Sequence, residues 1–190
     1  HVPLIVPEVN PEEIKKNKGI IANPNCSTIQ AVVALKPLDD KYKIKRIVYS
    51  TYQAVSGAGR DGIYDVENGI KNFKESSDIN VASSNKYELK KYPYPIFNNC
   101  LPHIDVFLDN GYTKEEMKMI NETRKILGRP DLAITATTVR VPVLNSHSES
   151  INVEFENDYN LEEVKDLLKN SPAIKVIDDV SSLKYPLATD

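Results

Sequence analysis

Helix signals and strand signals alternate along most of this 190-residue chain. Residues 44–55 alternate well enough for a strand, and glycines at 57 and 59 separate them from a helical pattern over 60–73. Thr113 with Glu116 forms a capping box before a helix, and the β-branched residues of 132–143 predict a strand after it. This order predicts a fold of the α/β (α+β) type, with a mixed β-sheet covered by helices.

Local signals also predict several shorter elements. Asn10 followed by Pro11 predicts the capped start of a short helix that ends at Gly19. The other expected elements are strands at 19–23, 151–156 and 173–180, a helix at 27–38, and a helix from Asn160 and Glu163 to residue 170. Residues 76–103, with prolines at 93, 95 and 102, are expected to form a long irregular excursion.

Composition limits the classes of partner. The chain is 41% hydrophobic and 27% charged, which suits one core, or a core with a small satellite. A net charge of −3 without clustered Lys or Arg favours neither nucleic acid nor an anionic membrane. No apolar run approaches the roughly 20 residues that span a bilayer, and the start HVPLIVPEVNP lacks the plan of a secretory signal. We therefore expect a cytoplasmic protein.

Cys26 lies in the phrase IIANPNCSTIQ, where an apolar strand, a polar turn and a helix follow one another. A thiol in the first turn of a helix meets unsatisfied N–H groups and the positive end of the helix dipole, and both favour the thiolate. The same N–H groups could hold an oxyanion formed when the thiolate attacks a carbonyl. The plainer alternative is a small buried apolar residue. Cys26 and Cys100 are both expected to be free thiols.

Three histidines could handle a proton for such a nucleophile. His1 is terminal, and His103 lies in the loop phrase CLPHID. His147 lies between two expected strands and follows Arg140, an anion-binding side chain, by seven residues. His147 is therefore the preferred acid/base candidate, although a loop histidine taken alone is more often only solvated.

Four phrases together resemble aspartate-semialdehyde dehydrogenase, in the form typical of Gram-positive bacteria and their relatives. They are NPNCSTIQ, STYQAVSGAG, DNGYTKEEMKMINETRKILG, and VRVPV followed by HSES. The resemblance covers nearly the whole chain in the family's order. It implies a fold similar to the C-terminal catalytic domain of glyceraldehyde phosphate dehydrogenase.

The resemblance also implies a domain organisation. Residues 1–190 would form the catalytic and dimerisation domain, while the N-terminal Rossmann domain and a C-terminal helix would lie outside this chain. No glycine fingerprint for a dinucleotide follows an early strand. NADP would accordingly be bound mainly by the N-terminal domain, the partner would be a second copy in a homodimer, and the isolated chain would be inactive.

The implied reaction is the reduction of L-aspartyl 4-phosphate by NADPH to L-aspartate 4-semialdehyde, and its reverse. It belongs to the biosynthesis of lysine through diaminopimelate, and of threonine and methionine. By resemblance, Cys26 forms a thioester, His147 handles the proton, and Gln53 orients the reacting carbonyl. No metal site is implied.

The resemblance implies binding roles for six further residues. Arg140 would grip the substrate carboxylate with a planar fork. Glu115 would contact the substrate amine and Lys118 the phosphate, and Asn25 would join the substrate site. Ser56 and Gly57 would bring backbone to the nicotinamide end of the cofactor. Without the resemblance, Glu115 and Lys118 would be interpreted as an ordinary solvated pair on one helix face.

Two kinds of alternative stay open. Another acyl-phosphate reductase of the same fold, acting on N-acetylglutamyl phosphate, would share the cysteine and histidine but not the Gln, Glu, Lys and Arg set. A chain that serves only for interaction or dimerisation, or a cysteine hydrolase, belongs to a different class. The GxSxG and CGSCW-type signatures of hydrolases are not found in the sequence.

Overall fold

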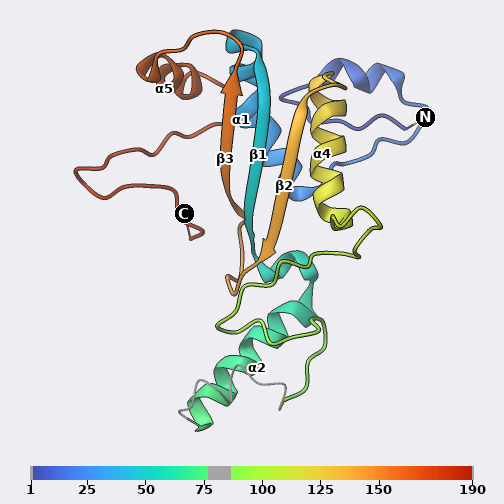
Figure 1. The fold of residues 1–190 in the computed structure, drawn as a ribbon, viewed down its shortest axis with the longest axis vertical. Coiled ribbons are helices and arrows are strands. Elements are labelled where there is room, and N and C mark those ends of the chain that lie inside the picture. The colour runs from blue at the N-terminus through green and yellow to red at the C-terminus, as the bar shows by residue number, and fades with distance from the viewer. Residues whose placement is uncertain (1, 77–86, 190) are drawn as a thin grey trace. The chain divides into compact units, whose positions relative to one another are not determined.

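The described residues, 2–76 and 87–189 of a computed structural model, contain one three-stranded sheet. Its strands are β1 (Ile44–Gln53), β2 (Ala133–Arg140) and β3 (Ser148–Phe155), in the order β2-β1-β3. The arrows of β2 and β3 point in opposite directions in Figure 1. Because β1 pairs with both, the sheet is mixed, and the expected fold class is confirmed.

The chain divides into two compact units. Unit 1 is made of His1–Tyr49, Glu115–Ala136 and Glu149–Pro186, and unit 2 of Ser50–Lys114, Thr137–Ser148 and Leu187–Asp190. The division falls within β1 and β2, so each of these strands begins in unit 1 and ends in unit 2. Each unit is therefore described through its own contacts.

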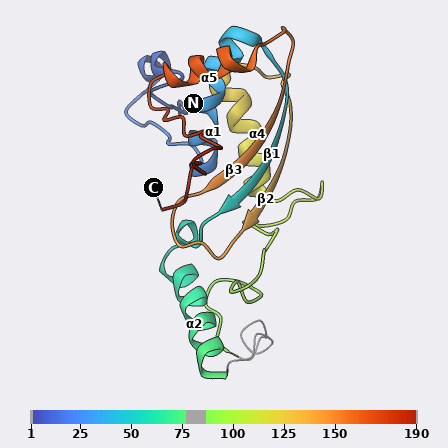
Figure 2. The ribbon, with the colours of Figure 1, turned by 90° about the vertical axis from the view of Figure 1, so that its left-hand side faces the viewer.

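Three α-helices of unit 1 lie on one side of its strands (Figure 2). They are α1 (Cys26–Tyr42), α4 (Lys114–Leu127) and α5 (Leu161–Lys169). Ile44, Ile47 and Tyr49 of β1 are completely buried, and the Tyr49 hydroxyl lies 3.0 Å from the Thr123 Oγ1 of α4. Burial of these side chains from water supplies the main attraction between helix and strand.

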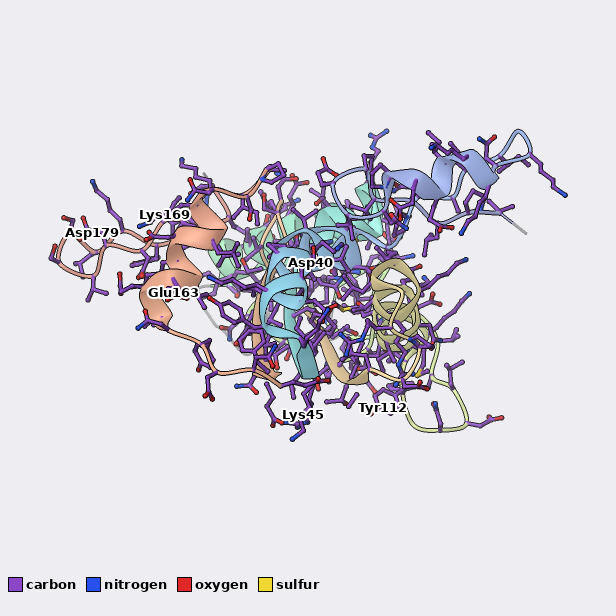
Figure 3. The ribbon with its side chains drawn as sticks, turned by 90° about the horizontal axis from the view of Figure 1, so that it is seen from above. Asp40, Lys45, Tyr112, Glu163, Lys169 and Asp179 are labelled. Atoms are coloured by element: carbon purple, nitrogen blue, oxygen red, sulfur yellow. The ribbon has the colours of Figure 1, made fainter. Side chains whose placement is uncertain are left out.

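The outer surface of α5 is charged, as an amphipathic helix requires. Figure 3 shows Glu163 and Lys169 on this helix. Glu163 pairs with Lys41 of α1 at 3.2 Å, and Lys169 pairs with Asp166 at 3.4 Å. Such exposed pairs contribute little to stability, because water screens both charges.

Three local predictions for unit 1 are wrong. Residues 11–16 form a short 3₁₀ helix, η1 (Pro11–Lys16), but Asn10 does not cap it. The Asn10 side chain is buried, and its Oδ1 accepts a hydrogen bond from the Val6 N–H at 2.8 Å. This oxygen therefore pairs with the backbone of the preceding segment instead of with the N–H groups of the helix.

The other two errors concern expected strands. Residues 19–23 contain only a single parallel bridge, between Ala22 and Leu4. Residues 173–180 contain only one bridge position, where Asp179 pairs with Lys184. β-branched residues favour an extended backbone, but a strand also needs a neighbour with which to exchange hydrogen bonds along its length.

Unit 2 packs α2 (Arg60–Ser76) against an irregular segment. The 3₁₀ helix η2 (Val55–Ala58) leads from β1 into α2, and the core consists of Val55, Val66, Tyr92, Ile96 and Leu101. Residues 87–103 contain no helix and no strand beyond a bridge at Leu101, as the sequence predicts. Residues 77–86 of the expected excursion, and His1, lie outside the described residues.

A buried carboxylate holds the irregular segment in place. Asp65 of α2 is completely buried and accepts hydrogen bonds from the N–H groups of Lys90, Lys91 and Tyr92 at 2.8, 2.9 and 3.0 Å. These bonds satisfy three backbone N–H groups that do not donate to a neighbouring strand. One side chain thus fixes a stretch that lacks regular structure.

Candidate active site

The thiol of Cys26 lies at the first residue of α1 and is exposed. Asn25 caps this helix, and its Oδ1 accepts hydrogen bonds from the N–H groups of Ser27 and Thr28 at 3.0 and 3.2 Å. The predicted position of the cysteine at a helix start is therefore confirmed. Its exposure excludes the alternative of a buried apolar residue.

The same cap corrects one expectation about this helix start. The sequence predicts that N–H groups of the first helical turn could hold an oxyanion, but those of Ser27 and Thr28 already donate to the Asn25 side chain. The helix dipole still favours a negative charge here. A hydrogen bond to an oxyanion would have to come from another donor.

Asn25 also links Cys26 to α4. Its Nδ2 donates to Glu115 Oε1 at 2.7 Å, and its backbone N–H donates to Glu122 Oε2 at 2.8 Å. Glu115 is only 6% exposed, and its Oε2 lies 3.5 Å from the ammonium of Lys118. Unit 1 thus brings four predicted residues together, and Glu115 is not the solvated surface residue of the plainer interpretation.

Glu122 is a member of this cluster that the sequence analysis missed. It follows Glu115 and Lys118 on α4 at a spacing of seven and four residues, so all three lie on one helix face. That spacing was visible in the sequence. The sequence did not show that the backbone N–H of Asn25 donates to this second carboxylate.

A half-buried carboxylate faces α1 one turn after Cys26. Glu149 of β3 accepts a hydrogen bond from Gln30 Nε2 at 2.7 Å through Oε1, while its Oε2 is buried without a hydrogen-bond partner. Burial raises the pKa of Glu149 from 4.5 to about 7, and the Gln30 hydrogen bond opposes part of this rise. Glu149 therefore titrates near neutral pH.

The predicted residues of unit 2 lie around the end of β1. Gln53 is the last residue of that strand, is 1% exposed, and accepts a hydrogen bond from Thr51 Oγ1 at 3.2 Å through Oε1. Its backbone carbonyl accepts from the Val141 N–H at 3.0 Å. Gln53 is thus held by its own unit through its side-chain oxygen and through its backbone carbonyl.

Arg140 and His147 share a neighbour. Nη1 of Arg140 donates to the carbonyl oxygen of Ala54 at 2.6 Å, and Nδ1 of His147 accepts from the Ala54 N–H at 2.9 Å. Arg140 is 6% exposed, and its Nε is buried without a hydrogen-bond partner. Unit 2 thus brings the predicted acid/base residue and the predicted substrate arginine to one residue, Ala54.

Ser56 and Gly57 belong to η2, beside the same two side chains. A Cβ atom placed on Gly57 would lie 3.1 Å from Arg140 Nη1 and 3.2 Å from His147 Cε1. The missing side chain therefore permits a close approach of this backbone to both residues. Gly57 is exposed, which fits a segment that meets a ligand.

A comparison with known protein families identifies the family of this chain. Residues 35–190 match the model of the family described as "Semialdehyde dehydrogenase, dimerisation domain". The chain belongs to that semialdehyde dehydrogenase family. The matched range includes Gln53, Glu115, Lys118, Arg140 and His147, and begins after Cys26.

Relatives of this semialdehyde dehydrogenase domain extend the similarity to the cysteine end. The aspartate-semialdehyde dehydrogenase of Aquifex aeolicus is 54% identical over 188 residues, 98% of this chain and 53% of the relative. The aspartate-semialdehyde dehydrogenase II of Vibrio cholerae, solved in complex with ASA, has a TM-score of 0.83 and 45% identity, over 90% of this chain and 49% of that one. The Candida albicans enzyme, solved with NADP, has a TM-score of 0.59 and 29% identity, over 89% and 44%.

The chain spans about half the length of the curated relatives it matches. Among residues 2–76 and 87–189, each helix is too short or too polar to cross a bilayer.

Proposed function

We propose that this chain is the catalytic and dimerisation part of an aspartate-semialdehyde dehydrogenase. The enzyme converts L-aspartyl 4-phosphate to L-aspartate 4-semialdehyde, and the reverse, in the biosynthesis of lysine, threonine and methionine. One observation carries the proposal: an exposed thiol opens α1, and the residue that caps this helix is hydrogen-bonded to Glu115, which lies beside Lys118.

In the proposed reaction, the Cys26 thiolate attacks the acyl carbon of aspartyl phosphate. A carbon–sulfur bond forms, the carbon–oxygen bond to phosphate breaks, and the product is a thioester. Gln53 orients the reacting carbonyl, and His147 acts as the hydrogen-bonding acid/base residue. The fixed side chains of Gln53 and His147 support these roles, because neither has to be ordered when the substrate binds.

Charged side chains provide substrate recognition. The Arg140 guanidinium binds the substrate carboxylate, the Glu115 carboxylate binds its ammonium group, and Lys118 contacts phosphate. Glu115 already accepts from Asn25, but a carboxylate has further lone pairs for a substrate amine. This carboxylate favours a free amine over the uncharged amide of N-acetylglutamyl phosphate.

NADP fits beside the backbone of Ser56 and Gly57, because Gly57 is exposed and leaves no side chain in front of Arg140 and His147. When bound, NADPH supplies the hydride that reduces the thioester. Most of the cofactor contacts are proposed to belong to a nucleotide-binding domain outside these 190 residues. The isolated chain should consequently show no NADPH-dependent turnover, because the binding energy of the remote part of the cofactor is missing.

The proposed assembly is a homodimer, which the name of the matched family supports. A single self-complementary surface suffices for a twofold pair. Light scattering on the 190-residue chain at micromolar concentration should show a dimer if the interface is of the large apolar class. A monomer at that concentration would refute the assembly and leave the assignment of the reaction in place.

The reaction is tested with the product of the full reading frame. Phosphate-dependent NADP⁺ reduction should occur with aspartate semialdehyde and be much slower with N-acetylglutamate semialdehyde. The reverse preference would identify the alternative acyl-phosphate reductase. Thiol-dependent ester hydrolysis without reduction of NADP⁺ would instead favour a cysteine hydrolase.

A further inference from the structure

Ala54 contacts both functional side chains of unit 2 through its backbone alone. Its N–H donates to His147 Nδ1 at 2.9 Å, and its carbonyl oxygen accepts from Arg140 Nη1 at 2.6 Å. The methyl side chain is completely buried and carries no polar atom. Two chemically different side chains are thus held by the donor and the acceptor of one residue.

The neighbouring backbone keeps Ala54 in place. The Gln53 carbonyl accepts from the Val141 N–H at 3.0 Å, and the N–H groups of Val55 and Ser56 donate to the carbonyls of Val143 and Leu144 at 2.8 and 3.1 Å. The Val55 side chain lies in the core of unit 2. Ala54 therefore lies between hydrogen bonds on both sides, so it can act as a fixed reference for His147 and Arg140.

The bond to His147 selects one form of the imidazole. A backbone N–H can only donate, so the Nδ1 that faces it must carry a lone pair. In a neutral imidazole the proton then resides on Nε2. In a doubly protonated ring, the Nδ1–H of His147 would point at the Ala54 N–H. The ring's positive charge would also lie near that of Arg140, because a Cβ atom placed on Gly57 would be within 3.2 Å of both side chains.

The geometry points to Ala54 as the positioning residue of this site: its N–H fixes His147 as a neutral Nε2–H donor, while its carbonyl orients the Arg140 guanidinium. The part of this inference that concerns catalysis rests on the proposed function. It specifies the role of His147 as hydrogen-bond donation from Nε2 to the oxyanion that forms on the reacting carbonyl carbon.

The chemistry balances with such a donor. Each oxyanion formed at the carbonyl carbon collapses to a carbonyl when it expels phosphate or the Cys26 thiolate, and neither collapse needs a proton from the histidine. The departing phosphate takes its proton from solvent. His147 can therefore keep its Nε2 proton through the cycle and stabilise the developing negative charge.

The direct test is nuclear magnetic resonance of the 15N-labelled 190-residue chain. We expect a scalar coupling across the hydrogen bond between the Ala54 amide nitrogen and His147 Nδ1, with the imidazole proton on Nε2. His103, which stacks on Phe107 with a centroid distance of 4.5 Å, provides a reference imidazole in the same spectrum. A proton on Nδ1 of His147, or no coupling to Ala54, would overturn the inference. Because this measurement needs no turnover, its outcome is separate from that of the proposed function.

A variant tests the consequence for catalysis in the product of the full reading frame. The φ of Ala54 is −64°, which a proline adopts, and Gln53 before it is in an extended strand, which a following proline requires. Ala54→Pro removes the N–H, places ring carbon where it stood, and keeps the carbonyl. We expect kcat to fall by about 10²-fold or more, the scale of losing one hydrogen-bond donor to an oxyanion.

A double-variant comparison separates positioning from general damage. If Ala54 acts through His147, Ala54→Pro should cost little more in a His147→Gln background, whereas general damage would add to the loss. Ala54→Gly, which retains both backbone groups, should preserve the scalar coupling to His147. Full kcat in Ala54→Pro, or additive losses, would refute the inference. If Ala54→Pro does not fold, the scalar coupling between Ala54 and His147 in the unsubstituted chain still tests the inference.

Discussion

The cysteine cluster of unit 1 (Asn25, Cys26, Glu115 and Lys118) and the histidine cluster of unit 2 (Gln53, Gly57, Arg140 and His147) are built by different means. In the cysteine cluster, side chains hold side chains: Asn25 Nδ2 donates to Glu115 Oε1 at 2.7 Å. In the histidine cluster, the backbone of Ala54 holds both Arg140 and His147.

This difference predicts how each cluster responds to mutation. A side-chain network loses one member at each substitution, and each buried partner left behind costs about 1 to 3 kcal/mol. A backbone contact survives most substitutions of the residue that makes it. Substitution of supporting residues should therefore disturb the cysteine cluster. In the histidine cluster, substitutions should matter mainly at the residues with proposed catalytic roles.

The largest expected effect is at Cys26, the proposed nucleophile. In the product of the full reading frame, Cys26→Ser should lower turnover by about 10⁴-fold or more, because a hydroxyl at this position stays protonated. The matched control is Cys100→Ser, which removes the other exposed thiol. Substantial turnover by Cys26→Ser under phosphate-dependent assay would remove Cys26 from the reaction.

In the histidine cluster, Arg140→Lys keeps the charge and loses the planar fork. It also loses the geometry that reaches the Ala54 carbonyl, so kcat/KM should fall by an amount equivalent to roughly 2 to 4 kcal/mol. Steady-state kinetics with varied aspartate semialdehyde measure this. An unchanged kcat/KM would show that Arg140 does not bind the substrate carboxylate.

Glu149 gives unit 1 a dependence on pH. Because burial raises its pKa from 4.5 to about 7, the folded state binds more protons than the unfolded state between these values. Its contribution to the free energy of unfolding is complete below pH 4.5 and decreases as pH rises through about 7, by about 3 kcal/mol in total.

Glu149→Gln should remove this decrease and make the chain more stable than the parent above pH 7. Urea unfolding of the 190-residue chain at several pH values measures it. The control is Glu154→Gln on the same strand, where the carboxylate is exposed and pairs with Arg46 at 2.9 Å. If the free energy of unfolding of Glu149→Gln changed with pH in the same way as that of the parent, the raised pKa of Glu149 would be contradicted.

Two helix caps allow a matched comparison of supporting residues. Asn25 and Asn160 each accept two N–H hydrogen bonds at a helix start, but only Asn25 also donates to a buried carboxylate. Asn160→Ala should cost about 1 kcal/mol of unfolding free energy, and Asn25→Ala about 2 kcal/mol. Equal losses would indicate that the Glu115 contact adds no stability.

The smallest expected effect is a difference in thiol reactivity. Cys26 and Cys100 are both exposed, so access alone does not separate them. Cys26 lies at the first residue of α1, beside the positive end of the helix dipole, and we expect it to alkylate about tenfold faster than Cys100 at neutral pH. Peptide mapping after timed treatment with iodoacetamide measures both rates, and equal rates across pH would refute an activated Cys26.

The sequence by itself determined the elements with strong local signals. The two-residue period of β1 and the apolar spacing of α1 placed both elements within a few residues of their observed ends, and Asn160 capped α5 as expected. The sequence also placed Cys26 at a helix start, because a polar turn followed by apolar residues at helical spacing is a helix start signal. The roles of Glu115, Lys118 and Gln53 came from the family resemblance, since no local pattern separates them from surface residues.

Only the tertiary structure decided which polar groups pair. Asn10 and Asn25 both precede a helix, yet Asn25 caps its helix and Asn10 serves a neighbouring buried segment. The strand expected at 173–180 does not form, because pairing depends on a partner distant in sequence. Ala54 carries no side-chain signal at all, and its two backbone bonds to His147 and Arg140 exist because residues 86 and 93 positions later fold back onto the end of β1.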